Sequence, residues 1–297
     1  MGFIVASWSL LVLHLLLVVH SSESKQVMGK ENEDNNIRLP SSKFGEMIKD
    51  DVNPQKREYH SHSSSHMAHM DHNIMVFFTM KDLKVGEEMP IYFPKKSPST
   101  SPPFLPRDEA NKIPFSLGEL PKLLKFFSFS QGSPQATAME DTLRQCETQS
   151  IKGETKFCAT SFESMIDFTR GIFGLDESRF SVLTTTYLTN LSTTFQNFTI
   201  LDVQELLASK MVTCHVKPYP YAIYYCHIQE SENKLYNISL GGENGDRVEA
   251  VAVCHMDTSQ WSPNHVSFQV LRTEPGALPV CHFFPAGDLI WVPTSMI

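Results

Sequence analysis

Hydrophobic positions divide the chain into three parts. An apolar stretch runs from Leu10 to Val19, and residues 23–73 are polar, mixed in charge and poor in large apolar side chains. From Ile74 onward, apolar runs recur to the end of the chain. A segment that buries little apolar surface does not offset the entropy cost of ordering. We therefore predict a signal peptide over residues 1–22, a disordered leader over 23–73 and one folded domain over 74–297.

The first segment has a second interpretation, a membrane anchor. Its apolar stretch is shorter than the roughly 20 residues that span a bilayer, and His14 interrupts it. Small polar residues at Ser21, Ser22 and Ser24 follow it, as at a signal-peptidase site. We favour a secretory signal peptide, and we expect no transmembrane segment later in the chain.

Two helices are predicted in the first half of the folded domain. Ser133 and Pro134 have the residue types of an N-cap and a first helical position. Thr160 and Glu163 form a capping-box pattern ahead of an apolar periodic run that Gly174 closes.

The second half has the texture of strands. Its apolar runs are rich in β-branched and aromatic residues, and no alternation of strands and helices indicates a parallel sheet. The predicted strands are Val182 to Leu188, Phe198 to Val203, Val248 to His255 and Val266 to Leu271. The pattern favours a single α+β domain, with helices in its N-terminal part and a largely antiparallel β C-terminal half.

The net charge and the predicted secretion limit the functions and modifications that the chain can have. With 33 acidic and 25 basic residues the net charge is -8, which disfavours binding to nucleic acid. In an oxidising compartment, six cysteines fit three disulfides, with 15 connectivities open. Sequons at Asn190, Asn197 and Asn237 are candidate glycosylation sites there.

One dipeptide, Cys-His, occurs four times and carries most of the specific information. The pairs are separated by 10, 26 and 25 residues, and a tryptophan follows the last pair after 8 more. The residues are Cys214-His215, Cys226-His227, Cys254-His255, Cys281-His282 and Trp291. Neighbouring residues on a strand point to opposite faces, so each pair presents sulfur on one face and imidazole on the other.

The spacing suggests two local disulfides. Cys214 and Cys226 are symmetric about Pro220 and could face each other across a hairpin, with His215 and His227 on the reverse face. Cys146 and Cys158 are also twelve residues apart and would form a structural staple.

Disulfides on one side of the strands could preorganise up to four imidazoles on the other. The candidate metal ligands are His215, His227, His255 and His282, with His265 as a possible fifth. Four imidazoles without a carboxylate favour copper(II) or a closed zinc site. Two alternatives stay open: histidines that serve packing alone, and zinc held jointly by thiolates and imidazoles.

The leader contains its own histidine cluster. These residues are His60, His62, His66, His69 and His72, interleaved with Met67 and Met70. Such a composition suits soft or borderline metals, and it is equally typical of a solvated linker. We favour the linker.

The four Cys-His pairs and their terminal tryptophan resemble the BURP domain of plant proteins. The likeness extends from about Ile74 to Val292 and includes Phe77-Phe78, the segment from Cys146 to Phe168, and the run from Cys254 to Ser259 that leads to Trp261. The short leader resembles the unknown-seed-protein-like branch.

This resemblance implies a protein of the secretory pathway, bound for the cell wall or the protein storage vacuole. It implies a role in seed or reproductive development or in stress response, with copper held by the four histidines and cysteines as the scaffold. We favour a non-enzymatic role, because the leader offers Tyr59 but no tryptophan and no repeated core peptide.

Relatives suggest two other functions. One is a copper-dependent peptide cyclase that crosslinks tyrosine or tryptophan side chains of a peptide substrate. The other is a cell-wall subunit that modulates a pectin-degrading enzyme, with wall polysaccharide or wall enzymes as partners.

Overall fold

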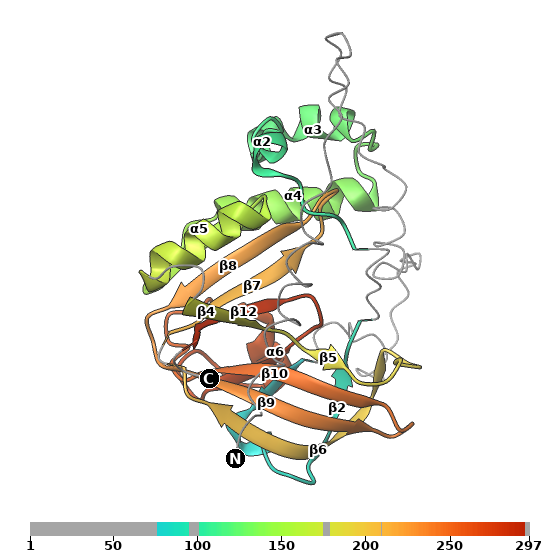
Figure 1. The fold of residues 1–297 in the computed structure, drawn as a ribbon, viewed down its shortest axis with the longest axis vertical. Helices are drawn as coiled ribbons and strands as arrows, with labels where there is room; N and C mark the ends of the chain where they lie inside the picture. Colours follow the sequence, from blue (N-terminus) through green and yellow to red (C-terminus); the bar gives the residue numbers. More distant parts are fainter. Residues whose placement is uncertain (1–75, 95–100, 175–178, 209, 295–297) are drawn as a thin grey trace, which may run out of the picture. The chain divides into compact units, whose positions relative to one another are not determined.

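The computed structural model describes residues 76–94, 101–174, 179–208 and 210–294 (Figure 1). The predicted signal peptide, the leader and its histidine cluster lie outside these residues. All described residues belong to one compact unit, residues 39–297. None of the described helices is long and apolar enough to cross a membrane.

Strands dominate the second half of the chain, as predicted. In chain order the elements are β1 (Phe77–Thr79), η2 (Met80–Asp82), β2 (Glu88–Tyr92), α2 (Arg107–Ala110), η3 (Leu117–Glu119), α3 (Leu120–Phe126), α4 (Pro134–Glu147), β3 (Glu154–Ala159), α5 (Phe162–Phe173), β4 (Phe180–Leu183), β5 (Thr186–Tyr187), β6 (Phe195–Leu206), β7 (Val212–Lys217), β8 (Ile223–Gln229), β9 (Asn233–Gly242), β10 (Arg247–His255), α6 (Val266–Leu271), β11 (Val280–Phe284) and β12 (Leu289–Pro293).

The strands form two antiparallel sheets. A seven-stranded sheet has the order β1-β11-β10-β9-β6-β2, with β5 paired to β10 off this path, and a five-stranded sheet has the order β3-β8-β7-β12-β4. Helix α5 packs on the five-stranded sheet, and α4 lies beside it (Figure 1). This arrangement confirms the predicted α+β class.

Local capping explains where the two long helices begin and end. At α4, the Ser133 hydroxyl accepts a hydrogen bond from the backbone N–H of Ala136 at 3.2 Å, with Pro134 at the first position, as predicted. Helix α5 ends at Gly174, whose φ of 64° is left-handed. Its N-cap differs from the prediction, because Ser161 caps it and pairs with Ser164.

The prediction of a strand from Val266 to Leu271 was wrong, because this segment is helix α6. The apolar alternation of so short a run fits either element, and the residues at its two ends decide between them. His265 caps the helix by accepting a hydrogen bond from the backbone N–H of Ser267, and Arg272 ends it with a φ of 51°.

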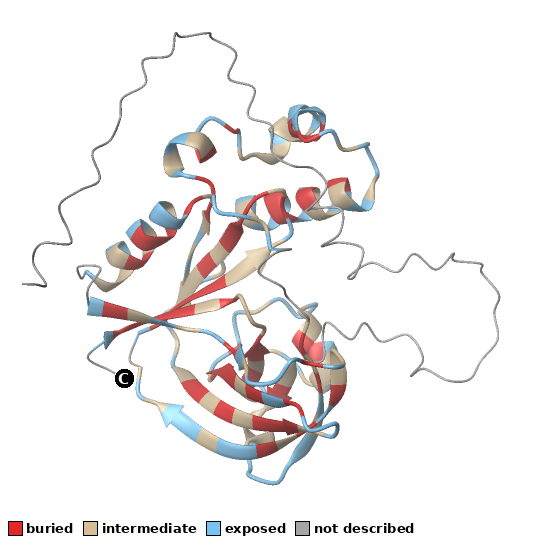
Figure 2. Cartoon of the chain, turned by 45° about the vertical axis from the view of Figure 1, so that its right-hand side comes forward, coloured by how far each residue is buried: buried red, intermediate tan, exposed pale blue. Residues whose placement is uncertain are grey.

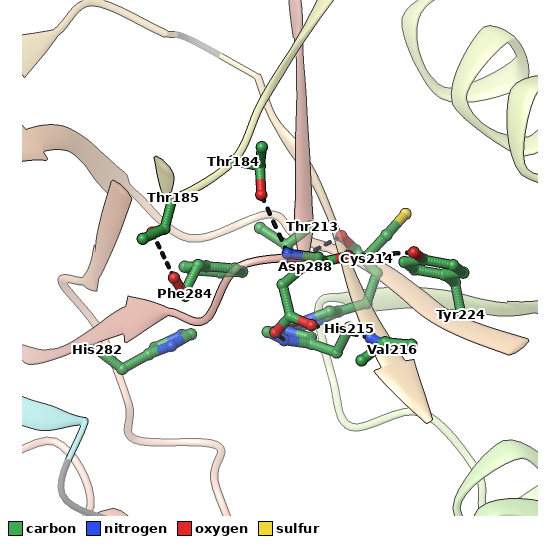
Figure 3. Close-up of polar contacts among 12 residues, drawn as sticks. Thr184, Thr185, Thr213, Cys214, His215, Val216, Tyr224, His282, Phe284 and Asp288 are labelled. Carbon is green, nitrogen blue, oxygen red and sulfur yellow. Dashed lines mark hydrogen bonds and ion pairs between the residues drawn. The ribbon is translucent and has the colours of Figure 1, made fainter. Parts of the chain in front are cut away.

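The predicted strand from Val182 to Leu188 is two strands in different sheets. Strand β4 pairs with β12, whereas β5 pairs with β10. The buried Thr185 lies at the crossing, where its hydroxyl donates to the carbonyl of Phe284 at 2.5 Å (Figure 3). The same hydroxyl accepts from the backbone N–H of Val251 at 3.0 Å. The Thr185 side chain thus bonds to backbone groups at the point where the chain passes from one sheet to the other and the strand pairing is interrupted.

Buried residues run along both sheets (Figure 2). One apolar cluster lies within the seven-stranded sheet, and another lies between α5 and the five-stranded sheet. A third cluster joins residues of the two sheets and includes Val251, Val253, Phe284, Ile290 and Val292. The third cluster therefore sets how the strands that carry the Cys-His pairs face each other.

Candidate metal centre

The six cysteines form three disulfides. Cys214 bonds Cys226 between β7 and β8, and Cys254 bonds Cys281 between β10 and β11. In both cases the partners are directly opposite in the strand register, with a Cα–Cα distance of 3.9 Å.

The third bridge is the predicted staple between Cys146, at the end of α4, and Cys158 in β3. Both predicted local bridges are therefore confirmed. No cysteine is left as a free thiol. The disulfides leave no thiolate for the alternative of a mixed Cys-His zinc site.

The two cross-strand disulfides lie in separate cores. Cys214 and Cys226 belong to the cluster under α5, and Cys254 and Cys281 belong to the cluster of the seven-stranded sheet. Because side chains alternate along a strand, the four adjacent imidazoles point to the reverse faces. In both sheets, therefore, the cysteine and the histidine of each pair lie on opposite faces.

The four imidazoles form two facing pairs. The Nε2 atoms of His215 and His227 are 3.4 Å apart, and those of His255 and His282 are also 3.4 Å apart. The pairs adjoin each other, because the ring centroids of His215 and His282 are 5.8 Å apart (Figure 3). Phe284 lies against both of these rings, at 4.9 and 4.6 Å between centroids.

A carboxylate lies beside each Nδ1 atom of the pair His215 and His227. Asp288, in the β11–β12 connection, has its Oδ2 atom 2.9 Å from Nδ1 of His215, and its Oδ1 atom accepts the backbone N–H of Val216 (Figure 3). Oε1 of Glu154 lies 3.2 Å from Nδ1 of His227. An ionised carboxylate only accepts hydrogen bonds, so Nδ1 of His215 carries its proton, whereas Nδ1 of His227 lies near Glu154 without a hydrogen bond.

An amide fixes His255 in the same tautomer. Asn233 is opposite His255 in the β9–β10 register, and its Oδ1 atom lies 2.7 Å from Nδ1. The Nδ2 group of Asn233 donates to the carbonyl of Ser231 at 2.8 Å, which orients Oδ1 toward the histidine. The Nδ1 atom of His255 is therefore the donor, and its Nε2 atom carries a lone pair.

Burial lowers the pKa of three of the four histidines. It lowers the pKa of His255 well below its usual value, and neighbouring histidines act in the same direction. Burial and the neighbouring His215 lower the pKa of His282 to about 3. For His227, burial outweighs the opposing effect of Glu154, and the pKa is again lowered.

Glu154 is itself ionised. Burial raises the pKa of its carboxyl group, but the adjacent His227 and the hydrogen bond from Tyr225 outweigh burial, and the net shift is downward. This carboxylate lies 3.2 Å from Nδ1 of His227.

His265 has a different role. Its Nδ1 atom accepts the backbone N–H of Ser267 at the start of α6, and burial lowers its pKa. In the neutral ring Nε2 then carries the proton, so His265 has no free lone pair for a metal. Trp261 lies between His265 and His255, with ring centroids 4.6 and 4.9 Å away.

A pocket of about 590 Å³ opens in front of the histidines. Its walls include all four imidazoles, apolar and aromatic side chains, and two lysines. Besides the histidines, the residues that matter here are Phe77, Lys156, Lys217, Tyr225, Trp261 and Asp288. Within the described part of the chain, no three His, Cys, Asp or Glu side chains stand in an arrangement that holds a metal ion without further movement.

The sequence analysis did not predict which residues lie against the Nδ1 atoms of the histidines. Glu154, Asn233 and Asp288 reach the histidines from three separate elements, and no spacing links them to the Cys-His pairs. The register would have revealed only Asn233, because it is the cross-strand neighbour of His255.

The three sequons differ in their surroundings. Asn190 is exposed in the loop between β5 and β6. Asn197 is exposed on β6 and donates to Glu243, whereas Asn237 is half-buried in β9 and donates to Glu249 at 3.2 Å. Exposed loop sites are the most accessible to a glycosyltransferase, so Asn190 remains the best of the three candidates.

A family model for the BURP domain matches residues 76–293. Several plant proteins are similar over most of the chain. BURP domain-containing protein BNM2A of Brassica napus is 42% identical over 246 residues, which cover 81% of this chain and 87% of the relative. BURP domain protein USPL1 of Arabidopsis thaliana is 41% identical over 228 residues, covering 75% and 81%. BURP domain protein RD22 of the same plant is 39% identical over 245 residues, covering 82% and 62%.

Replacing Cys254 and Cys281 together by alanine is expected to lower the free energy of unfolding by about 2–4 kcal/mol, because the closed loop no longer restricts the unfolded chain. Denaturant unfolding of the variant and the wild type measures the difference.

A peptide map of the wild-type protein under non-reducing conditions provides the control. It should recover the three bridges described above. Reduced thiols at these positions in an air-exposed sample would contradict the disulfide scaffold.

Proposed function

The chain belongs to the BURP domain family, and we propose that it is a plant secretory-pathway protein that binds copper through His215, His227, His255 and His282. Its role lies in seed or reproductive development or in stress response. The name of its relative USPL1, unknown seed protein-like, supports the seed context. The facing Nε2 atoms of the two histidine pairs carry the proposal.

In the pair His215 and His227, Nδ1 of His215 donates to Asp288, so its Nε2 atom presents a lone pair to Nε2 of His227 at 3.4 Å. Without a metal, a proton on Nε2 of His227 can bridge the two nitrogens. A metal ion that takes the place of this proton would be bound by both nitrogens.

The spacing within each pair suits one ion. Two nitrogens bound at about 2.0–2.1 Å with an angle near tetrahedral are separated by about 3.3–3.4 Å. Both Nε2–Nε2 distances match this value. The pairs adjoin through His215 and His282, and the rings would have to move to bring four nitrogens to one centre.

The donor set suits copper. Imidazole suits copper, zinc and iron, and the absence of thiolates from the set removes the ligands that zinc most often shares with histidine. Asp288 and Asn233 orient two of the rings through Nδ1, as carboxylates and carbonyl groups do around histidine ligands in general. Bound copper would supply one-electron oxidation chemistry.

The pocket supports a second candidate function, oxidative peptide crosslinking. A non-catalytic copper site does not need an opening of about 590 Å³ beside its ligands. The aromatic walls at Phe77 and Trp261 suit an aromatic side chain. This candidate requires a peptide from outside the domain or from the leader.

Copper binding should depend on both histidine pairs. Wild-type protein loaded with copper(II) and passed over a desalting column is expected to retain one copper per chain. His227→Ala and His282→Ala, one from each pair, should each lose stoichiometric copper, because each removes a ligand of the same centre. Elemental analysis measures the metal content, with zinc loading as a parallel sample.

His265→Ala is the matched control, since it removes a histidine from the same pocket that has no free lone pair. It should retain copper. Two coppers per wild-type chain, with one lost in each ligand variant, would indicate two separate sites, and a folded wild type without copper would reject the proposal.

Asp288→Asn should weaken copper binding by about 10–100-fold, the usual cost of losing the partner that orients a histidine ligand. The asparagine has one acceptor oxygen for the two donors that the carboxylate now serves. Competitive titration against a chelator measures the affinity. Asp167→Asn, an exposed carboxylate on α5 that pairs with Arg107, should leave the affinity unchanged. Equal affinities in all three proteins would contradict the role of Asp288.

Oxidative crosslinking predicts a mass change. Joining two groups X–H and Y–H into X–Y removes two hydrogens, which dioxygen accepts. Full-length protein incubated with copper and dioxygen should lose about two mass units in a Tyr59-containing peptide. The same incubation of His282→Ala should leave the mass unchanged. An unchanged mass in copper-loaded wild type would exclude crosslinking of its own leader.

A further inference from the structure

Two lysines flank one tyrosine beside the histidines. The strand register places Lys156 opposite His227, and Tyr225 opposite His215. Lys217, two residues after His215, lies on the same face as all of these side chains. The two lysine Nζ atoms are 5.4 and 5.2 Å from the centroid of the Tyr225 ring.

Neither ammonium group forms a direct ion pair with a described residue, although the carboxylate of Asp288 attracts Lys217 from a greater distance. Lys156 donates to the carbonyl of Gln145 at 2.9 Å, and the half-buried Lys217 has its recorded contact with the Tyr225 ring. The two neighbouring carboxylates already serve other groups. Asp288 bonds to His215, and Glu154 accepts from the Tyr225 hydroxyl at 3.0 Å.

A positive charge in a partly buried pocket without a direct ion pair is costly. A cation–π contact offsets part of this cost, by roughly 0.5–2 kcal/mol. An anion that enters the pocket can form direct ion pairs with both lysines, and these must outweigh the repulsion from Glu154 and Asp288, which line the same pocket. The lysine pair is therefore a candidate recognition site for an anionic group of a ligand.

The rest of the pocket favours a peptide as the carrier of that anion. Phe77 and Trp261 offer aromatic surface, and Gln145, Gln149 and Gln229 offer amide groups that can pair with a peptide backbone. A volume of about 590 Å³ accommodates a few residues.

We propose that Lys156 and Lys217 bind the carboxylate of a short aromatic peptide, and that the histidine end of the same pocket receives its aromatic side chain. The inference rests on the proposed function only for the metal in front of that side chain. The carboxylate end needs no metal.

Binding of three small peptides to the full chain tests the proposal. They are N-acetyl-Gly-Tyr-Gly with a free carboxylate, its C-terminal amide, and N-acetyl-Asp-Tyr-Gly amide, which carries the carboxylate on a side chain. Calorimetry at low salt should show at least about tenfold tighter binding of a carboxylate form than of the neutral amide, as expected for a charge pair worth about 1.4 kcal/mol or more. The first and third peptides distinguish a terminal carboxylate from a side-chain carboxylate.

Lys217→Met removes the charge and keeps the length of the side chain, so the preference should fall below about threefold. Lys217→Arg keeps the charge and should keep the preference. Lys122→Met, on the exposed face of α3, is the matched control and should bind like the wild type. Circular dichroism establishes that each variant is folded.

Three results would overturn the proposal. They are equal binding of the acid and the amide by wild type, an unchanged preference after replacement of both Lys156 and Lys217 by methionine, and lysine-dependent binding of trigalacturonate with no binding of the peptides. Copper content measured on the same samples reports on the proposed function separately. A wild-type protein that binds no copper but still prefers the carboxylate peptide would reject the proposed copper site and support this inference.

Discussion

Side-chain alternation along a β-strand is the constraint on which the candidate site depends. A Cys-His pair on a strand must send its sulfur and its imidazole to opposite faces. A disulfide between directly opposite residues then fixes the register, and a slip of one residue would move every histidine to the wrong face. In β7–β8 and β10–β11 the sulfurs occupy two separate cores, so the histidines are left for the space between the sheets.

Convergence of the two histidine pairs depends on packing between the sheets. The cluster that contains Val251, Phe284 and Ile290 draws residues from both sheets. Phe284 also contacts the rings of His215 and His282, one from each pair. Thr185 closes the same junction by bonding to the backbone of Phe284 and Val251. The inter-sheet core and the histidine cluster therefore form one continuous structure, in which a change in the core would be felt at the imidazoles.

The sequence predicted what local rules decide. Pro134 and Gly174 mark helix ends through their own backbone preferences, and the Cys214–Cys226 hairpin follows from spacing around a turn. The short run from Val266 to Leu271 was misassigned because its pattern fits both elements and the cap at His265 decided the outcome. The partners Glu154 and Asp288 were missed because only tertiary packing brings them to the histidines.

The histidine end and the lysine end of the pocket share the same carboxylates. The carboxylates of Asp288 and Glu154 line the same pocket as the two lysines, yet Asp288 is bonded to His215 and to the backbone of Val216, and Glu154 accepts from Tyr225. If Asp288 turned to Lys217 instead, the Nδ1 proton of His215 would be left without its acceptor, which is costly. Asp288 therefore attracts Lys217 only from a distance, and the ammonium group of Lys217 is left without a direct ion pair in the pocket.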